Sequence, residues 1–464
     1  MWINSCTIHI ILALIFSAWV SSLPLIGFWT GLLWIVICGI ALGLIDPVRK
    51  AEETVEQARA GFLLRLIHDP FLYAGVAAIG FFLSEALNGG RHLVYHPKVG
   101  EWAFTLPVWR WGPSSVMSAD AWRTFTLAFA CIGICAVLRH ATGKAGRMLV
   151  LQCMSWHASA LALWMVVRLA LQQFLGLYGL PSLIFSAPSD AVGAYYVLML
   201  AISCALALDR GILGQFSPWM ALPLILNFSG VLLSGHPPSI LVAWAFTVTY
   251  ILYVILFAWP LFSIVQITKK IVFGVVPFLI GGALYVRYHS VNLFISTAYA
   301  SGTWGDLIAG WMPGYQKSVE AAFRIWGQHP WIGVGSGGFK SFAPMHGLVE
   351  FMREDRHAGN DLAEYLCEHG LLGCGLVALA FGTIIIGYAR RLALLPEVSN
   401  GFGTLPDRCL LFRMTPIAVV LSLGLTWVGV LSFSGAVFHS PFVSLSWCAT
   451  VTCLGSFLPM RRAI

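Results

Sequence analysis

Charged residues are scarce in this sequence. Asp, Glu, Lys and Arg make up 10% of its 464 residues, whereas soluble domains carry about 25%. Hydrophobic residues make up 58%, and the mean hydropathy is +0.81. Residues 211–268 contain none of the four charged types. Because charge is expensive inside a bilayer, this composition excludes an ordinary soluble domain and predicts an all-α, polytopic membrane protein.

Metal-binding and disulfide patterns are also missing. The sequence has eleven cysteines but no Cys-x-x-Cys pair. Most of the cysteines lie inside apolar runs, where they act as small apolar side chains. We therefore expect no disulfide framework, no metal cluster and no cofactor. The cysteines inside apolar runs are Cys38, Cys131, Cys135, Cys153, Cys204, Cys374, Cys448 and Cys453.

Other classes of protein are disfavoured by further absences. No stretch alternates aromatic and basic residues as a nucleic-acid surface does, and the net charge of +7 arises mostly at the ends of apolar runs. No internal repeat is visible. The N-terminus lacks a basic segment before its first apolar run, so we expect that run to be a retained span and not a cleaved signal peptide.

Twelve apolar runs are long enough to be transmembrane helices of roughly 20 residues, although ten or eleven spans remain possible. They divide the chain into a bundle of nine spans (1–287), one large polar loop (288–369) and three further spans with a tail (370–464). The expected spans are 5–21, 25–45, 71–88, 120–138, 148–171, 189–207, 218–234, 240–262, 271–287, 370–389, 413–433 and 441–458.

The distribution of basic residues predicts the orientation. The short loops and the tail that share one side of a twelve-span topology hold sixteen Lys and Arg, whereas the opposite short loops hold Arg91, Lys98 and Arg110. Basic residues are enriched in cytoplasmic loops. We therefore expect both termini in the cytoplasm and the loop 288–369 on the outer, periplasmic side of a bacterial inner membrane.

The large loop contains thirteen of the charged residues and two recognisable segments. Residues 312–328 have the apolar spacing of an amphipathic helix, with Arg324 on its polar face. The glycine-rich run that follows, from Gly333 through Gly335 to Lys340, could present backbone amides to an anion. A simple connection between two helices explains the same glycines, and the ending of a P-loop is absent.

The end of the loop gathers cations beside carboxylates. Arg353, Arg356 and His357 lie within five positions, and Asn360 is a natural N-cap for the helix that enters the next span. Asp361 and two glutamates share one face of that helix at spacings of three and four. A solvated helix start explains these residues too. Guanidinium groups bind phosphate bidentately and histidine transfers protons near neutral pH, so the alternative is a site for a phosphate-bearing substrate.

A second outer turn contains one more candidate, His236, before two prolines that interrupt the helical pattern. We expect it at the mouth of the bundle.

In two segments the chain resembles the O-antigen ligase and O-antigen polymerase superfamily of bacterial inner-membrane proteins. The first is RIWGQHPWIGVGSGGFKSF, and the second is HAGNDLAEYLCEHGLLG, in which Asn360 and Gly370 are separated by the family's nine residues. The resemblance covers roughly residues 180–450. It departs at Gly359, where members have the histidine that is taken as the general base.

The resemblance implies a glycan transferase that needs neither nucleotide nor metal. Its donor is a glycan on undecaprenyl diphosphate, and its acceptor is a hydroxyl of lipid A core, of another glycan or of a protein. The implied roles are diphosphate binding by cations, proton transfer by His357 with Asp355 and Asp361 as other candidates, and orientation by Asn360. The residues expected to bind the substrate are Arg324, Lys340, Arg353, Arg356, His236, Gly333 and Gly335.

Two other functions remain open. Twelve spans also suit a transporter or flippase of lipid-linked glycans, although such carriers usually show repeats and charged groups at mid-membrane. The mid-span candidates here, Glu85 and Arg168, lie near span ends, from which their side chains can reach the interface. The third possibility is a non-catalytic family member that binds the same lipid, since Gly359 cannot move a proton.

Overall fold

The computed structural model describes ten stretches of the chain, and all structural statements below refer to them. They are residues 4–20, 26–48, 53–90, 93–96, 101–175, 187–212, 217–258, 315–346, 357–393 and 414–458. The predicted span 271–287, together with Arg353 and Arg356, lies outside the described residues.

The described chain is built from helices. The first half contains α1 (Ser5–Val20), α2 (Ile26–Ile45), α3 (Val55–Ile67), α4 (Pro70–Leu87), α5 (Ser118–His140), α6 (Lys144–Leu175), α7 (Ser189–Ile212), α8 (Ala221–Leu233) and α9 (Pro237–Tyr253). The second half contains α13 (Tyr315–Gln328), α14 (Gly338–Phe342), α15 (Asp361–Ala393), α16 (Pro416–Leu431) and α17 (Pro441–Leu454). Short 3₁₀ turns include η4 (Ala343–His346) and η7 (Val437–His439).

Apolar helices occupy every predicted span that falls on described residues. Six of them, α4, α5, α6, α7, α9 and α15, are long and apolar enough to cross a membrane, and α1, α2, α8, α16 and α17 are shorter apolar helices. The membrane-type helical fold that the composition predicts is thus present. The total of twelve spans stays a prediction.

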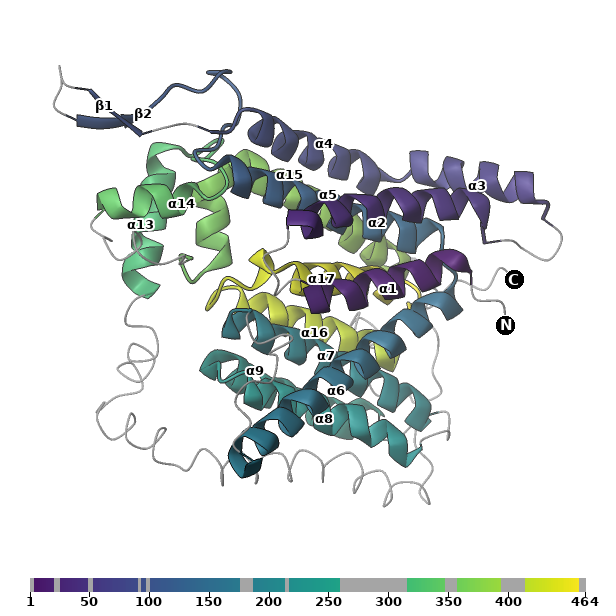
Figure 1. Cartoon of the computed structure of the whole chain (residues 1–464). Helices are drawn as coiled ribbons and strands as arrows, with labels where there is room; N and C mark the ends of the chain where they lie inside the picture. The colour runs from purple at the N-terminus through teal and green to yellow at the C-terminus, as the bar shows by residue number, and fades with distance from the viewer. Residues whose placement is uncertain are drawn as a thin grey trace.

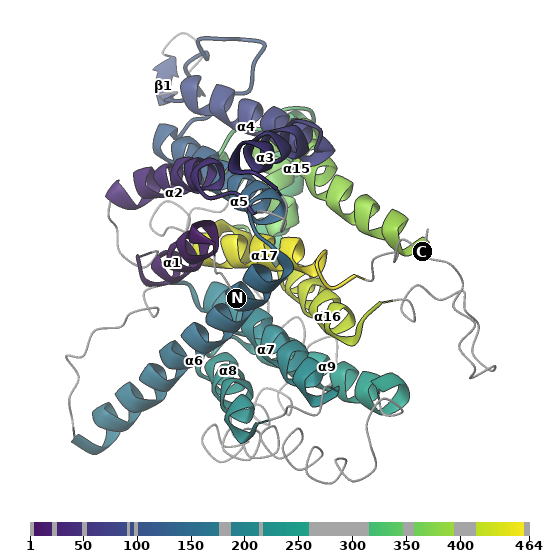
Figure 2. The same ribbon diagram turned by 90° about the vertical axis from the view of Figure 1, so that its right-hand side faces the viewer.

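The helices form three layers (Figures 1 and 2). Helices α2, α3, α4, α5 and α15 lie in one outer layer, α1 and α17 lie in the middle, and α6, α7, α8, α9 and α16 form the other outer layer. The apolar stretch of helix α7 is completely buried inside the bundle. It meets α16 where a side chain at Gly424 would collide with Ala201, so a small residue allows the two backbones to approach closely.

One feature differs from the expected all-α fold. The segment after α4 contains a hairpin of two four-residue strands, β1 (Leu93–His96) and β2 (Glu101–Phe104), paired antiparallel from Leu93 with Phe104 to His96 with Glu101. Val94 and Tyr95 in β1 and Trp102 and Phe104 in β2 favour strands over a helix. They are too few to stand out against the long apolar runs, so the sequence indicated only a loop.

The two loops that were predicted to face outward lie at the same end of the bundle. Figure 1 shows the hairpin, α13 and α14 together at one end, with α3 at the opposite end. The Ser115 hydroxyl donates a hydrogen bond to the Ser336 carbonyl at 2.7 Å, which joins the loop after α4 to the large loop. The two loops thus meet at one end of the bundle, and the side of the membrane on which they lie stays a prediction.

Candidate functional site

The glycine run of the large loop fits into a break in α15. Gly370 adopts φ +62° and ψ −170°, which interrupts the helix one third of the way along. The amides of Leu371 and Leu372, freed by this break, donate to the carbonyls of Pro330 and Trp331 at 2.8 and 2.9 Å. The run from Pro330 therefore replaces the missing turn of α15 and fixes the large loop to the bundle.

Gly333 and Gly335 are required by this packing. Both have positive φ, 67° and 91°, and an added Cβ would collide with the backbone of Glu368 at Gly333 and of Ser114 at Gly335. Their amides are also engaged, since Gly333 donates to the His329 carbonyl and Gly335 to that of Glu368 at 3.0 and 2.7 Å. These two amides hold the loop in place and do not form the anion nest that the sequence suggested, so we drop both glycines from the substrate site.

Asn360 caps α15 as the sequence predicts. Its side-chain oxygen accepts the amide of Ala363 at 3.0 Å, the N-cap arrangement. The amide nitrogen of the same side chain donates to the Phe433 carbonyl at 3.2 Å, and the Asp361 amide donates to Ser432 at 2.8 Å. The start of α15 is thereby joined to the connection between α16 and α17.

Glu364, one turn into α15, holds the preceding loop. Its Oε1 lies 2.7 Å from Nδ1 of His357, and its Oε2 accepts the amide of Ala358 at 2.7 Å. The Glu364 side chain is 1% exposed and that of His357 is 27% exposed. One buried carboxylate thus fixes the imidazole while its other edge remains open to solvent.

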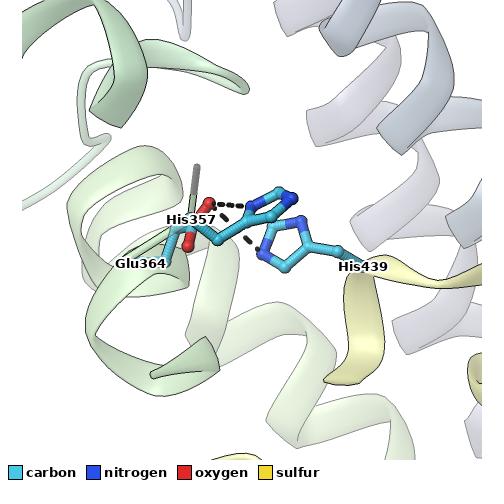
Figure 3. A group of neighbouring side chains, drawn as sticks. All are labelled: His357, Glu364 and His439. Atoms are coloured by element: carbon cyan, nitrogen blue, oxygen red, sulfur yellow. Dashed lines mark hydrogen bonds and ion pairs between the residues drawn. The ribbon is translucent and has the colours of Figure 1, made fainter. Parts of the chain in front are cut away.

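A second imidazole approaches the same carboxylate from a distant part of the chain (Figure 3). His439 Nε2, on η7, lies 3.6 Å from Glu364 Oε1 and 3.7 Å from Asp361 Oδ1. Neither His439 Nε2 nor Asp361 Oδ1 has a hydrogen-bond partner within the described ranges. The η7 segment is held between two carboxylates, because Phe438 donates its amide to Asp361 at 3.0 Å and Ala436 donates to Asp190 at 2.8 Å.

Aromatic contacts fix the orientation of His439. The ring of Tyr365 is stacked on it, with centroids 4.9 Å apart and an interplanar angle of 9°. The ring of His357 lies 4.5 Å from it at 34°. The ring of His369 lies 5.5 Å from that of Tyr365. Two rings therefore pack against the His439 imidazole and restrict its rotation.

The two imidazoles differ in their affinity for a proton. Burial opposes protonation of His357, but the charge and hydrogen bond of Glu364 outweigh it and raise the pKa of His357 to about 9. Burial dominates at His439 and lowers its pKa to about 3, against the attraction of Glu364 and with the help of charge on His357 and Lys340. At neutral pH the cluster therefore holds one imidazolium, His357, and one neutral imidazole, His439.

His357, Glu364 and His439 are also residue types that bind metal ions. Ligand atoms of His357, Glu364 and His439 all lie within 4.8 Å of one another. Ligands at about 2.1 Å from a tetrahedral zinc ion are roughly 3.4 Å apart. The His439 separation of 3.6 Å fits this spacing, but the His357–Glu364 separation of 2.7 Å fits a hydrogen bond. Because Glu364 already accepts two hydrogen bonds, we interpret the cluster as a site for protons.

A second polar cluster lies behind the first. Both carboxylate oxygens of Glu85 accept from Ser336, from its amide at 2.6 Å and its hydroxyl at 3.2 Å, and Oε2 lies 3.2 Å from His369 Nδ1. Glu85 and His369 are each 1% exposed. The expectation that Glu85 reaches the interface is thus wrong, because its partners come from the large loop and from α15. The pair anchors that loop to α4.

A large apolar cavity begins at the first cluster. Its volume is about 970 Å³, and residues of α5, α15, α16 and α17 line it. Asp361, Tyr365 and Phe438 stand at one end of the lining, and Leu392 and Leu458 stand at the other. Beyond its break at Gly370, α15 lines the cavity from Gly373 to Leu392, which span about 30 Å. The lining residues Leu362, Ile385 and Val430 are 46%, 59% and 43% exposed, so the cavity is open along the side of the bundle.

The remaining predicted site residues take different positions. Lys340, on α14, is half-buried and close enough to lower the pKa of both His357 and His439. Arg324 lies on α13, 68% exposed and 3.8 Å from Glu320. His236 is buried at the start of α9, its Nδ1 2.8 Å from the Ser239 hydroxyl, and burial lowers its pKa although nearby Asp190 opposes this.

His439 is the functional residue that sequence reasoning missed. It lies some eighty positions after His357, in a short connection without other ionisable residues. The available signal is its place two residues before Pro441, at the start of an apolar run. His236 precedes Pro237 in a similar way, at the mouth of another span. A comparison of all outer turns would have selected both histidines.

Comparison with models of known protein families finds no match to this chain, and no curated protein matches it significantly.

Proposed function

We propose that this protein transfers a glycan from a lipid diphosphate, of the undecaprenyl type, to an acceptor hydroxyl. The proposal includes twelve spans, cytoplasmic termini, and a large loop on the periplasmic side of a bacterial inner membrane. The reaction class is that of the O-antigen ligases and polymerases, which the motifs around His329 and Asn360 resemble. Surface polysaccharide synthesis is the corresponding process.

The junction of a long apolar cavity with a charged cluster carries this proposal. A substrate that fits both parts has a long hydrocarbon chain and a polar, anionic head. Beyond the break at Gly370, the apolar part runs beside about 30 Å of α15, which matches the roughly 30 Å of a bilayer core. Its opening between exposed side chains would admit a lipid sideways from the membrane. A compact, hydrophilic transport substrate would not need so long an apolar cavity.

Cations at the mouth support an anionic head group. The imidazolium of His357 and the ammonium of Lys340 lie there together, and the His357 side chain remains partly exposed. Positive groups that face the leaving oxygen stabilise the charge that develops when a diphosphate departs. The diphosphate itself provides the activation. Arg353 and Arg356, four residues and one residue before His357, lie outside the described residues and remain proposed contributors.

The test is an assay of the purified full-length protein with an undecaprenyl-diphosphate-linked oligosaccharide and an alcohol acceptor, in the presence of a chelator. We expect undecaprenyl diphosphate and glycosylated alcohol to appear together. Binding of the donor without its cleavage would instead support the non-catalytic alternative. Movement of an intact donor between leaflets of proteoliposomes, again without cleavage, would support the flippase.

A further inference from the structure

The cluster contains two imidazoles, and their surroundings assign them different tasks. We infer that His439 accepts the proton of the acceptor hydroxyl, whereas His357 stays bound to Glu364 as a fixed cation for the leaving diphosphate. This inference rests on the proposed transferase function and replaces the assignment of His357 as the base.

The position of His439 is the first argument. Its neighbours Asp361, Tyr365 and Phe438 all line the apolar cavity, whereas Glu364, the partner of His357, does not. A lipid held in the cavity therefore brings its head group next to Asp361, whose Oδ1 lies 3.7 Å from His439 Nε2. The 21% exposure of the His439 side chain leaves an edge that an acceptor can approach.

The orientation of the ring is the second argument. Carboxylates of Glu364 and Asp361 face Nε2, which favours the tautomer with its proton on that nitrogen. Nδ1 then carries the free lone pair. Orientation of one imidazole nitrogen by a carboxylate, with the other nitrogen as base, is the arrangement of hydrolase triads. Separations of 3.6–3.7 Å are long, as is common without substrate.

The charges around His439 are the third argument. They come from Asp361, Glu364 and His369 on α15, His357 before it, Lys340 on α14, and Asp190 on α7, which binds the segment that carries His439. The lowered pKa of His439 keeps it unprotonated before the donor binds. An added diphosphate anion raises the proton affinity of a nearby imidazole. Binding of the donor would therefore convert His439 into a stronger base at the moment it is needed.

The proposed step is balanced. The acceptor oxygen forms a bond to the anomeric carbon while its proton passes to His439 Nδ1. The bond between the anomeric carbon and the diphosphate oxygen breaks, and its electron pair leaves with the lipid diphosphate beside the His357 imidazolium. His439 then releases its proton to solvent.

The test compares His439→Gln and His357→Gln, with His346→Gln on η4 as the matched control. The donor is an undecaprenyl-diphosphate-linked oligosaccharide, and the acceptors are ethanol and trifluoroethanol, whose hydroxyl is the more acidic. Loss of a general base costs about 10²–10⁴-fold in rate. We expect His439→Gln to lose this factor with ethanol, to recover much of it with trifluoroethanol, and to keep its donor KM. His357→Gln should weaken donor binding with both acceptors, and His346→Gln should match the wild type.

Several results would overturn the inference. An equal loss with both acceptors would assign His439 a structural role, and wild-type rates for His439→Gln would exclude any role. Activity abolished by a chelator and restored by zinc would show that the cluster holds a metal. In each of these cases the transferase function itself stands. A wild-type protein that never cleaves the donor would overturn both proposals.

Discussion

Glu364 and His357 are joined by a 2.7 Å contact between Oε1 and Nδ1, although seven positions and the start of a helix separate them in the sequence. The carboxylate is buried and the imidazole is partly exposed. This pair fixes the segment that contains Gly359. Gly359 itself has φ +72°, a conformation that favours glycine, so a histidine at 359 would be strained.

A double-mutant cycle on this pair should show strong coupling. Glu364→Gln and His357→Gln should each weaken donor binding, because either change removes the imidazolium from the mouth of the cavity. The double variant should be little worse than each single one, with a coupling energy of about 0.5–3 kcal/mol. Binding of undecaprenyl diphosphate to purified variants measures this. Additive losses would show that the two side chains act independently.

The stability conferred by His357 should decline at alkaline pH. Its pKa in the folded protein is about 9, above the 6.5 of a free histidine. The imidazolium therefore contributes fully below pH 6.5, and its contribution is lost as the pH rises towards and beyond 9. The difference in Tm between wild type and His357→Gln should be largest near pH 6 and vanish above about pH 10. A difference independent of pH would contradict the pairing.

Alanine at Gly333 should destabilise the fold. The positive φ and the collision with Glu368 each oppose a Cβ there, and strain of this kind costs about 1–3 kcal/mol. Gly327, on α13, has nothing near its Cβ direction and provides the matched control, for which alanine should be neutral or slightly stabilising. Thermal unfolding in detergent compares the two. Equal Tm values would show that the loop does not depend on this contact.

Replacement by Gln should change the stability of the protein by very different amounts at two ion-paired glutamates, Glu85 and Glu320. Glu85→Gln removes the buried negative charge that pairs with His369 and accepts the Ser336 amide. We expect it to lower the free energy of unfolding by about 3–5 kcal/mol. Glu320→Gln breaks an exposed pair with Arg324 that is worth about 0–1 kcal/mol. Chemical or thermal unfolding of both variants tests this contrast. A Glu85 variant as stable as the Glu320 variant would remove the anchoring role of the buried cluster.

A bulky residue inside the apolar cavity should hinder long lipids selectively. Gly429 on α16 lines the cavity and has open space around it, so Gly429→Trp would fill part of that space. Gly387 on α15 also has open space but does not line the cavity, so Gly387→Trp is the control. The KM for an undecaprenyl donor should rise at least about tenfold, the effect of 1.4 kcal/mol. A farnesyl donor should be affected far less; an equal rise for both lengths would argue against the cavity as the lipid site.

Much of the fold was predictable because its signals are local. Apolar runs located the described spans, and the N-cap role of Asn360 followed from its residue type and position. The role of the glycine run was not predictable, since it depends on the break at Gly370 some forty residues later. The partner of Glu85 was hidden for the same reason: Ser336 lies 251 positions away.

The candidate site was predicted in part. His357, Asn360 and Asp361 do lie together at the start of α15, as their spacing suggested. His439 joins them only because Asp190 and Asp361 hold the η7 segment in place. Such a contact between the large loop and the connection before the last helix leaves no periodic pattern in the sequence. This contact can be recognised only in the folded structure.

A structure of the protein with undecaprenyl diphosphate bound, in a lipid nanodisc, tests the central claim most directly. The account predicts that the diphosphate lies within hydrogen-bonding distance of His357 and beside His439, with the isoprenoid chain along α15 in the apolar cavity. A lipid bound at another face of the bundle, or a diphosphate at the end of the molecule that carries α3, would contradict it.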